Sequence, residues 1–412
     1  MCALRTATGV VGPYILRKTT PFSASLRVRS MATMGAMEMA GQTSDSFQRY
    51  IDIGINLTDP IFRGIYHGSR RHPDDLDAVI GRALEVGCKK LIVTGSDVTS
   101  SNDAMDLAQQ YPGTVYATAG IHPCSSQIFS SKSHEEGDGL SHACDPDPSK
   151  PVPEDDEPCP TKTESIISKL TALLEAARSQ APHERGLVAF GEFGLDYDRL
   201  HYCSKKIQLH SFSVQLKLAA SLNPQLPLFL HSRAAHRDFV SLLKANFGER
   251  LERLERGGVV HSFTGTMEEM EELAELGLYI GVNGCSLKTA ENCAVVGAIP
   301  LDRLMLETDG PWCEIRPSHE GFKYLLQEEQ GNNGGRRHEK PNNKSKNRPS
   351  APQGRFKIVK KEKWEEGAMV KGRNEPCTIE KVAKIVAAIK DIPIEDVCAA
   401  AWANTTKVYG LS

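Results

Sequence analysis

The chain of 412 residues lacks several features that would identify its class at once. Its 11 cysteines are dispersed and none forms a Cys-x-x-Cys pair, which argues against a disulfide scaffold and is typical of a reduced intracellular protein. No apolar run is long enough to cross a membrane. The formal net charge is only −3, so total charge indicates no nucleic-acid partner, and local charge has to decide that question. We therefore expect a protein of the cytosol, the nucleus or both, without membrane contact and with its oligomeric state open.

Acidic side chains are also absent from the start of the chain, where the first is Glu38. Five basic residues precede it: Arg5, Arg17, Lys18, Arg27 and Arg29. Together with frequent Ser and Thr, this composition resembles a mitochondrial transit peptide within residues 1–30. A disordered tail is the alternative, as is an early gene start, because Met31 and Met34 could each begin a shorter chain. We treat residues 1–48 as a disordered or targeting-like extension.

From residue 50 onward, short apolar runs alternate with segments of helical spacing. Eight runs read as strands buried on both faces: 50–55, 90–95, 114–120, 187–192, 226–231, 258–263, 278–283 and 303–309. Helical patterns between them include 74–87, 205–222 and 268–277. Near-continuous apolar strands that alternate with helices indicate a parallel sheet covered on both sides. Eight such units within about 260 residues favour a closed (β/α)₈ TIM barrel over a doubly wound open sheet.

Two polar stretches interrupt this rhythm, at about 125–163 and 329–361. Both compositions bury too little apolar surface to fold alone, so we predict disordered insertions within one domain, residues 49–412. They follow the third and eighth strands and so emerge at the carboxyl end of the barrel, where active sites of this architecture lie. Between residues 336 and 361 the second carries ten Lys and Arg residues against one acid, Glu339. Such a run either contacts phosphates or is merely solvated.

Metal-ligand side chains stand at the ends of four of the eight runs. They are Glu192 in GEFGLDYDR, His231 in LPLFLHSR, His261 in VVHSFTG, and Glu307 and Asp309 in ETDGPW. Parallel barrel strands place these ends on one rim, so the side chains would converge on one pocket. Imidazole with carboxylate binds Zn, Mn or Fe, and carboxylates alone suit Mg. A cation lowers the pKa of a bound water toward neutrality, so the predicted reaction is metal-assisted hydrolysis.

Each of these residues alone also has a structural interpretation. A single histidine at a strand end is more often a hydrogen-bonded rim residue than a ligand. Asp309 could cap the next helix, and Glu192 could pair with Arg199. The coincidence of donors at four strand ends favours the metal site over these separate readings.

The motifs GEFGLDYDR, PLFLHSRAAHRDF, VVHSFTG, LETDGPW and RNEPCTIEKV resemble the TatD family of metal-dependent deoxyribonucleases. The resemblance runs from about Tyr50 to Gly410, apart from the two insertions. It implies a TIM barrel of the metal-dependent hydrolase type and divalent-cation-dependent cleavage of DNA, typically as a 3′-to-5′ exonuclease on single-stranded ends. By analogy alone, it also suggests DNA repair or DNA degradation as the setting.

The resemblance implies two divalent cations held by the strand-end residues. Glu192 would bridge the cations, His231 and His261 would bind one, and Asp309 the other. Most relatives end strand one with a His-x-His pair, whereas Gly54 and Asn56 occupy those places here, as in the eukaryotic branch. The second cation would then be held mainly by carboxylates, water and substrate oxygens, which favours Mg²⁺ over Mn²⁺ or Zn²⁺.

Other rim residues are predicted to act on the substrate. His122, in GIHP, matches a family histidine and is expected beside the scissile phosphate, with Asp309 and Glu192 as catalytic partners. Arg233 would clamp a phosphate through paired N–H donors, unless it pairs with a loop acid. His236, Tyr66 and Trp312 complete the predicted substrate-binding set: the two aromatic rings would stack on bases, although plain packing is an alternative for Trp312.

The segment Asn374-Glu375-Pro376 reads as a helix start, with Pro near the first turn. Two rival functions stay open. One is a hydrolase of the same fold that acts on a small ester or amide. The other is a nucleic-acid-binding scaffold whose catalysis has decayed with the loss of His-x-His.

Overall fold

The computed structural model describes residues 48–132, 149, 152, 154–180, 186–326 and 355–411. The predicted N-terminal extension therefore lies almost wholly outside the described residues, as do the middle parts of both predicted insertions. Residues Ser46–Ser412 form one compact unit. No helix in the described ranges is both long and apolar enough to span a bilayer.

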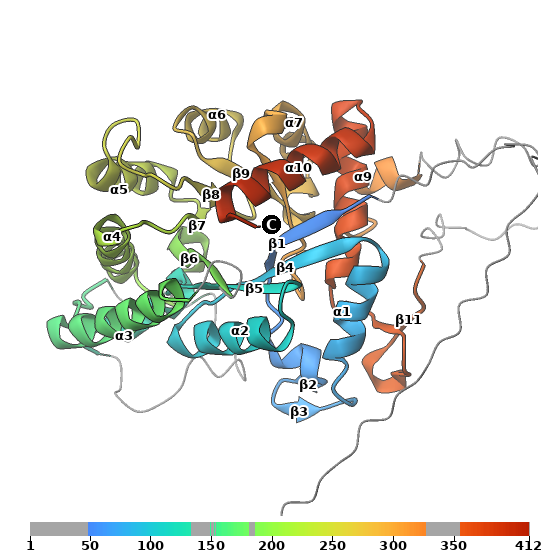
Figure 1. Ribbon diagram of the computed structural model, residues 1–412, viewed down its shortest axis with the longest axis horizontal. Helices are drawn as coiled ribbons and strands as arrows, with labels where there is room; N and C mark the ends of the chain where they lie inside the picture. Colours follow the sequence, from blue (N-terminus) through green and yellow to red (C-terminus); the bar gives the residue numbers. More distant parts are fainter. Residues whose placement is uncertain are drawn as a thin grey trace, which may run out of the picture. The chain divides into compact units, whose positions relative to one another are not determined.

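Eight parallel strands form one sheet in the order β1-β4-β5-β6-β7-β8-β9-β10. They are Tyr50–Ile55, Cys88–Val93, Val115–Ala119, Leu187–Asp196, Leu228–Arg233, Gly258–Val260, Tyr279–Val282 and Leu304–Leu306. Just past β10, the amide of Asp309 donates to the carbonyl of Gly54 over 2.8 Å, and that of Asn56 to the carbonyl of Gly310 over 2.9 Å. These bonds join the last strand region to β1, and Figure 1 shows helices surrounding the ring of strands. The predicted TIM barrel is confirmed.

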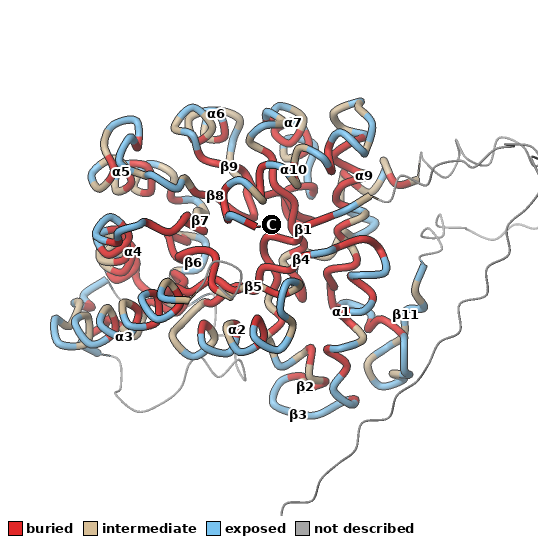
Figure 2. The backbone as a smooth tube through the Cα atoms, viewed as in Figure 1, coloured by how far each residue is buried: buried red, intermediate tan, exposed pale blue. Residues whose placement is uncertain are grey.

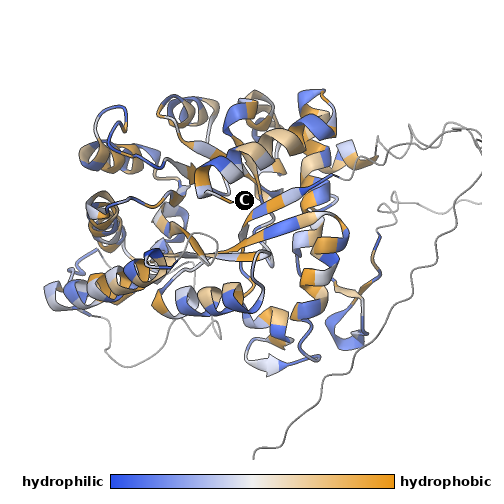
Figure 3. Cartoon of the chain, viewed as in Figure 1, coloured by the Kyte–Doolittle hydropathy of each residue, from blue (hydrophilic) through white to orange (hydrophobic). Residues whose placement is uncertain are grey.

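Helices cover the outside of the barrel. They are α1 Leu76–Glu85, α2 Val98–Gln110, α3 Pro160–Arg178, α4 Lys205–Ser221, α5 His236–Phe247, α6 Met267–Glu275, α7 Ala290–Ala298, α9 Ile379–Lys390 and α10 Ile394–Tyr409. The predicted helices 74–87, 205–222 and 268–277 match α1, α4 and α6 within two residues at each end. Side-chain caps fix two starts, since Ser204 accepts from the amide of Ile207 and Thr266 forms a capping box with Glu269. Hydrophobic and hydrophilic positions alternate along these helices (Figure 3), as amphipathic surface helices require.

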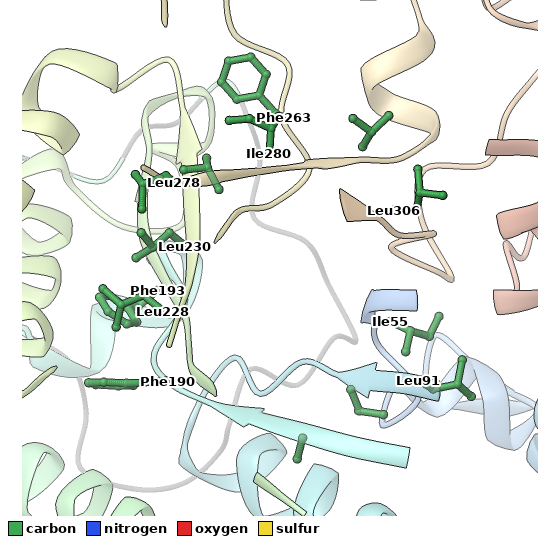
Figure 4. Close-up of a cluster of buried hydrophobic side chains, with 14 of the residues drawn as sticks. Ile55, Leu91, Phe190, Phe193, Leu228, Leu230, Phe263, Leu278, Ile280 and Leu306 are labelled. Atoms are coloured by element: carbon green, nitrogen blue, oxygen red, sulfur yellow. The ribbon is translucent and has the colours of Figure 1, made fainter. Parts of the chain in front are cut away.

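The strands are buried on both faces (Figure 2), which explains their near-continuous apolar sequences. Successive residues of a strand join two different clusters. Leu228 and Leu230 pack in the large cluster that includes the covering helices, part of which Figure 4 shows, whereas Phe229 packs with Met305 in a second cluster. That second cluster also contains Tyr409 at the end of α10. This alternation follows from strand geometry, because successive side chains of a strand point to opposite faces of the sheet.

The edges of both predicted insertions are part of the fold, so the predicted boundaries were too wide. Residues Pro123–Phe129 form the 3-10 helix η2, Ser130 bridges to Pro158, and α3 begins at Pro160, well inside the range 125–163. Buried Asp156 holds this join together by accepting from Ser130 Oγ at 2.6 Å and from Gln127 Nε2 at 2.7 Å. The composition of this segment did not predict the ordered contact between η2 and the start of α3, because polar hydrogen bonds and not buried apolar side chains form it.

At the other insertion, the described chain resumes at residue 355 within the predicted range 329–361. There β11, Ile358–Val359, pairs with β12, Met369–Val370. A second small sheet follows β1 and joins β2, Ile65–Tyr66, to β3, Ser69–Arg70. Both small sheets follow barrel strands in the chain and therefore belong to the carboxyl end of the barrel, together with the predicted site.

Candidate metal centre at the carboxyl end of the barrel

Three imidazole rings converge on one carboxylate oxygen, Glu192 Oε1. His261 Nε2 lies 2.7 Å from it, His231 Nδ1 3.0 Å and His122 Nε2 3.2 Å. All four side chains are at most 9% exposed. They come from β6, β7 and the residues that follow β5 and β8, so chain segments more than a hundred residues apart meet here as the strand-end pattern predicts.

Glu192 does not end its strand as the sequence suggested, because β6 continues to Asp196. The pairing of β6 with β7 shifts register between Gly191 and Phe193, which places a bulge at Glu192. Bulges re-aim a side chain while pairing continues on either side. A Cβ atom at Gly191 would lie 2.1 Å from the carbonyl oxygen of Phe229, so only glycine fits beside the bulge.

A second carboxylate stands behind each of two histidines. Asp196 Oδ2 lies 3.0 Å from His231 Nε2, and Glu307 Oε2 lies 3.4 Å from His261 Nδ1. Asp196 accepts the proton of His231 Nε2, which leaves His231 Nδ1 with its lone pair toward Glu192. This is the arrangement that orients a histidine as a metal ligand. His261 instead lies with Nε2 at 2.7 Å from Glu192 Oε1, and its Nδ1 and Glu307 Oε2 are buried without a hydrogen-bond partner in the described part of the chain.

His122 is arranged in the opposite sense. Its Nδ1 accepts a hydrogen bond of 3.0 Å from the amide of Cys124, at the start of η2. The neutral ring therefore carries its proton on Nε2 and donates toward Glu192. Although the donor atoms of His122, Glu192 and His231 all lie within 4.8 Å of one another, this tautomer suits a proton donor and not a metal ligand.

Two features of this geometry test the fit to a cation. His231 Nδ1 and His261 Nε2 lie 3.2 Å apart, and they lie 3.0 and 2.7 Å from the same carboxylate oxygen, Glu192 Oε1. The buried Nδ1 of His261 and Oε2 of Glu307 have no hydrogen-bond partner in the part of the chain that the structure describes, so the polar groups of the cluster do not satisfy one another. The donor set, two imidazole nitrogens and a carboxylate, is one that Zn²⁺, Mn²⁺ and Fe²⁺ accept. The residues present thus fit a divalent cation.

The electrostatics of the cluster agree with this reading. Burial acts to raise the pKa of Glu192, but the charges of His261 and His122 outweigh it and hold that pKa well below its usual range. Burial acts to lower the pKa of His261, whereas Glu192 and Glu307 raise it well above its usual value. The pKa of His122 rises to about 8, because Glu192 and Cys124 outweigh its burial. The negative charge around the centre therefore favours the protonated forms of His122 and His261.

Asp309 lies at the same end of the barrel and is held from two sides. Its Oδ1 accepts from Asn56 Nδ2 over 3.0 Å, and its Oδ2 accepts from the thiol of Cys313 over 3.2 Å. Burial raises the pKa of Asp309 to about 6, with the nearby charges of Glu307 and Glu192 acting in the same direction. Asp309 therefore senses Glu192 electrostatically, while its direct contacts are to Asn56 and Cys313.

Neighbouring side chains account for Gly54 and Asn56 at the two places where most relatives carry His-x-His. A Cβ atom at Gly54 would lie 2.5 Å from Glu307 Oε2, so Glu307 in its observed position excludes any side chain there. Asn56 in turn donates to Asp309, and its own oxygen accepts from Thr94. The two positions thus support the carboxylates of the rim instead of supplying imidazoles.

Two predicted substrate-binding residues remain available at the rim. Trp312 is 55% exposed, which excludes plain packing, and its amide donates to the carbonyl of Asp309 over 3.0 Å. Arg233 is half-buried and reaches only the carbonyl of Ser262, at 3.5 Å, while its buried Nε has no hydrogen-bond partner in the described part of the chain. The loop acid considered as a partner for Arg233 is not found among the described residues.

The other two substrate-binding predictions do not agree with the structure. Tyr66 is 7% exposed and its hydroxyl lies 3.1 Å from His72 Nε2, so its ring is not open to a base. His236 begins α5, and its Nε2 lies 2.9 Å from Glu272 Oε2, while Lys244 bonds to the other oxygen of that carboxylate, Oε1, at 2.8 Å. His236 therefore joins α5 to α6 and not to the centre.

Sequence reasoning missed Asp196 and gave Glu307 no role of its own. Asp196 stands in GEFGLDYDR, where a second acid four residues after Glu192 was the available signal. A third buried acid, Asp52 on β1, accepts from both the amide and the hydroxyl of Thr308. Burial raises the pKa of Asp52 to about 8, and its contacts tie β1 to the segment that carries Asp309.

Comparisons with known proteins identify the family of the chain. A family model described as TatD related DNase matches residues 51–410. A Schizosaccharomyces pombe protein named Deoxyribonuclease Tat-D is 44% identical over 357 residues, covering 87% of this chain and 94% of that protein. An Erwinia tasmaniensis protein named 3′-5′ ssDNA/RNA exonuclease TatD is 33% identical over 272 residues, covering 65% and 82%. The solved structure of an uncharacterized amidohydrolase from Saccharomyces cerevisiae gives a TM-score of 0.71 at 35% identity, covering 88% of this chain and 100% of that one.

The family match spans the whole barrel, including every strand that contributes to the centre. The sequence motifs, the fold and the relatives therefore support the same family. The chain belongs to the TatD related DNase family and is a hydrolase.

Proposed function

We propose that this chain is a divalent-metal-dependent deoxyribonuclease that removes nucleotides from the 3′ ends of single-stranded DNA. The observation that carries the proposal is the convergence of two histidine ring nitrogens on the Glu192 carboxylate at the carboxyl end of the barrel. The names of the S. pombe and Erwinia relatives support the substrate class and the direction of attack. The nine cysteines of the described residues are all free, which supports a reduced intracellular setting, the cytosol or nucleus.

Glu192, His231 and His261 would hold one cation, and Asp309 with Glu192 a second. When bound, such cations neutralise phosphate charge and make water acidic enough to ionise near neutral pH. Nitrogen ligands at the first position suit Zn²⁺ or Mn²⁺, and carboxylates at the second suit Mg²⁺, which we expect to support turnover.

The protein's own groups have separate tasks in the reaction. Asp309, with a pKa near 6, is largely ionised at neutral pH and accepts the proton of the attacking water. His122 presents its Nε2–H to the phosphate and supports the extra negative charge of the transition state. Arg233 has unsatisfied donors for a phosphate oxygen, and Trp312 offers an exposed face for a base. The penultimate nucleotide's 3′ oxygen is the leaving group.

A single-turnover assay on single strands labelled at the 3′ or the 5′ end tests the proposal. Run with Mg²⁺, Mn²⁺ and Zn²⁺ beside a panel of small esters and amides, it should show stepwise loss from the 3′ end that EDTA abolishes. Glu192→Gln and Asp309→Asn should each lower the rate at least about 10³-fold while the fold persists. Normal, EDTA-sensitive cleavage by Asp309→Asn would overturn the role of Asp309, and hydrolysis of the esters alone would overturn the substrate class.

A further inference from the structure

A buried ion network at the carboxyl end joins the loop after β1 to the segment before α9. Arg373 binds Asp75 with two bonds, of 2.8 and 2.7 Å, and Glu375 with one of 2.8 Å. Arg82 Nε bonds to Glu375 over 2.8 Å. All four side chains are at most 5% exposed. The motif that read as a helix start therefore clamps two loops whose sequences lie about 300 residues apart.

The clamp is attached directly to the segment that carries Asp309. Asn374 Nδ2 donates to the carbonyl of Thr308 over 2.9 Å, and its amide donates to the carbonyl of Pro311 over 3.0 Å. A Cβ atom at Gly310 would lie 2.9 Å from the carbonyl oxygen of Asn374. Side chains on the two clamped loops are therefore held in a fixed position relative to the metal centre.

They carry a set of cations, here named the basic rim. It consists of Arg70, Arg71, Lys360, Lys361 and Lys363. The first two belong to the β2–β3 hairpin and the others to the 3-10 segment that follows β11, both largely exposed (Figure 2). Within the described ranges, none of the five has a carboxylate within 4.0 Å.

Contacts between aromatic and basic side chains hold the two halves of the basic rim together. Lys361 Nζ lies 4.8 Å above the ring of Tyr66, which explains why Tyr66 is covered. Trp364 stacks on His72, with centroids 5.5 Å apart, and its indole nitrogen reaches Asp75 at 3.4 Å. Three acids lie on the same segment, Glu362, Glu365 and Glu366, of which Glu365 is paired with Lys357 at 2.6 Å.

Exposed apolar side chains border these cations. Apart from Leu84, the exposed large hydrophobic residues of the described chain are Trp312, 55% exposed, and Ile358, 54% exposed. Ile358 lines a cavity of about 40 Å³ with Glu314 and Ile315, so the segment just after Trp312 contacts β11. Cations interleaved with apolar platforms are what proteins use to hold single-stranded nucleic acid without reading its sequence.

We propose that the basic rim binds the phosphate backbone of the single strand on the 5′ side of the bond being cleaved, with Trp312 and Ile358 beneath its bases. This rests on the proposed function, because it places the scissile phosphate at the metal centre. A strand whose 3′ end enters that centre leaves it over the carboxyl face, and Trp312 connects the centre to the rim. The charge is positive and unpaired, which favours a polyanion over an apolar partner.

The test compares a short and a long substrate on the same protein. The triple variant R70Q/K360Q/K363Q removes three exposed charges of the rim and leaves the clamp intact. Its matched control, K217Q/R250Q/R256Q, removes three exposed charges from α4 and the loop before β8, away from the carboxyl end. Binding of labelled oligothymidine of about 20 nucleotides is measured by fluorescence anisotropy in EDTA at several salt concentrations. The value of kcat/KM is then measured on that strand and on a trinucleotide.

The rim variant should bind the long strand at least tenfold more weakly at low salt, and its slope of log K against log salt should fall by about 2, from about 0.7 for each lost phosphate contact. Its ratio of kcat/KM on the long strand to that on the trinucleotide should fall about tenfold, and the control should keep both values. The inference would be overturned if the rim variant kept the wild-type affinity for DNA and the wild-type salt slope. It would also be overturned if polyglutamate bound the wild-type rim while the variant bound DNA as tightly as wild type. Wild-type protein that cleaves neither strand refutes the proposed function, while the binding comparison still decides the rim.

Discussion

Two buried clusters of charged side chains lie at the same end of the barrel, and their charge balance differs. In the clamp, Asp75 and Glu375 face two arginines, so the net formal charge is zero. At the centre, the carboxylates of Glu192, Asp196 and Glu307 lie against three histidines, Asp309 lies nearby, and Arg199 pairs with Asp196 at 3.8 Å, which leaves −3 when the histidines are neutral. The clamp balances its own charge and the centre does not, and we take this difference to separate a structural cluster from the proposed cation site.

The largest effect on stability should come from breaking the balanced cluster. Glu375→Ala leaves Arg82 and Arg373 buried with one carboxylate fewer, so the free energy of unfolding should fall by about 3–5 kcal/mol. Denaturant titration measures it. Asp302→Ala is the control, because its pair with Arg303 is exposed and contributes about 1 kcal/mol or less. Equal losses for the two variants would contradict the assignment of the clamp as structural.

A smaller effect is expected at the unbalanced cluster. Asp196→Asn weakens the hold on His231 Nε2, so affinity for Mn²⁺ or Zn²⁺ should fall about 10–100-fold with little change in the stability of the metal-free protein. Calorimetric titration checks this. Asp156→Asn, another buried carboxylate but one bonded to Ser130 and Gln127, should leave the metal affinity unaltered. An equal loss in both variants would show that Asp196 acts only through general stability.

The smallest effect concerns the missing strand-one histidines. Gly54→Ala should destabilise the protein by about 1–3 kcal/mol, because its Cβ collides with Glu307 Oε2, and the double variant with Glu307→Asp should recover part of that loss. Gly81→Ala, on the open face of α1, should instead stabilise by about 0.5–1 kcal/mol. Thermal unfolding of five proteins decides the point: wild type, Gly54→Ala, Glu307→Asp, the double variant and Gly81→Ala. Additive losses in the double variant would refute the coupling.

The comparison also shows what the sequence could predict. The proximity of His231 and His261 could be predicted because parallel strands bring their carboxyl ends to one rim, whatever the sequence separation. Asp196 was not, because a bulge lets β6 run on past Glu192, and nothing in the alternation of residues marks that irregularity. Tyr66 looked like a rim aromatic because the segment that covers it, at Lys361, lies almost 300 residues away.

The clamp was hidden for the same reason. Glu375 followed by Pro376 has the local pattern of a helix start, and the helix is there, with α9 beginning at Ile379. Its bonds to Arg82 and Arg373 depend on tertiary contacts that local spacing does not encode. Positions that act through a partner distant in the chain are the ones that sequence patterns leave out.

The central claim is that the cluster around Glu192 is incomplete without a divalent cation. Titration of the metal-free protein with Mn²⁺, followed by calorimetry and by the electron paramagnetic resonance of the free ion, tests it directly. We predict saturable binding that His231→Ala or Glu192→Gln weakens at least about 100-fold, with protons released as the cation displaces them from the histidines. Absence of saturable binding at millimolar Mn²⁺ or Zn²⁺, or equal binding by the two variants, would contradict the account.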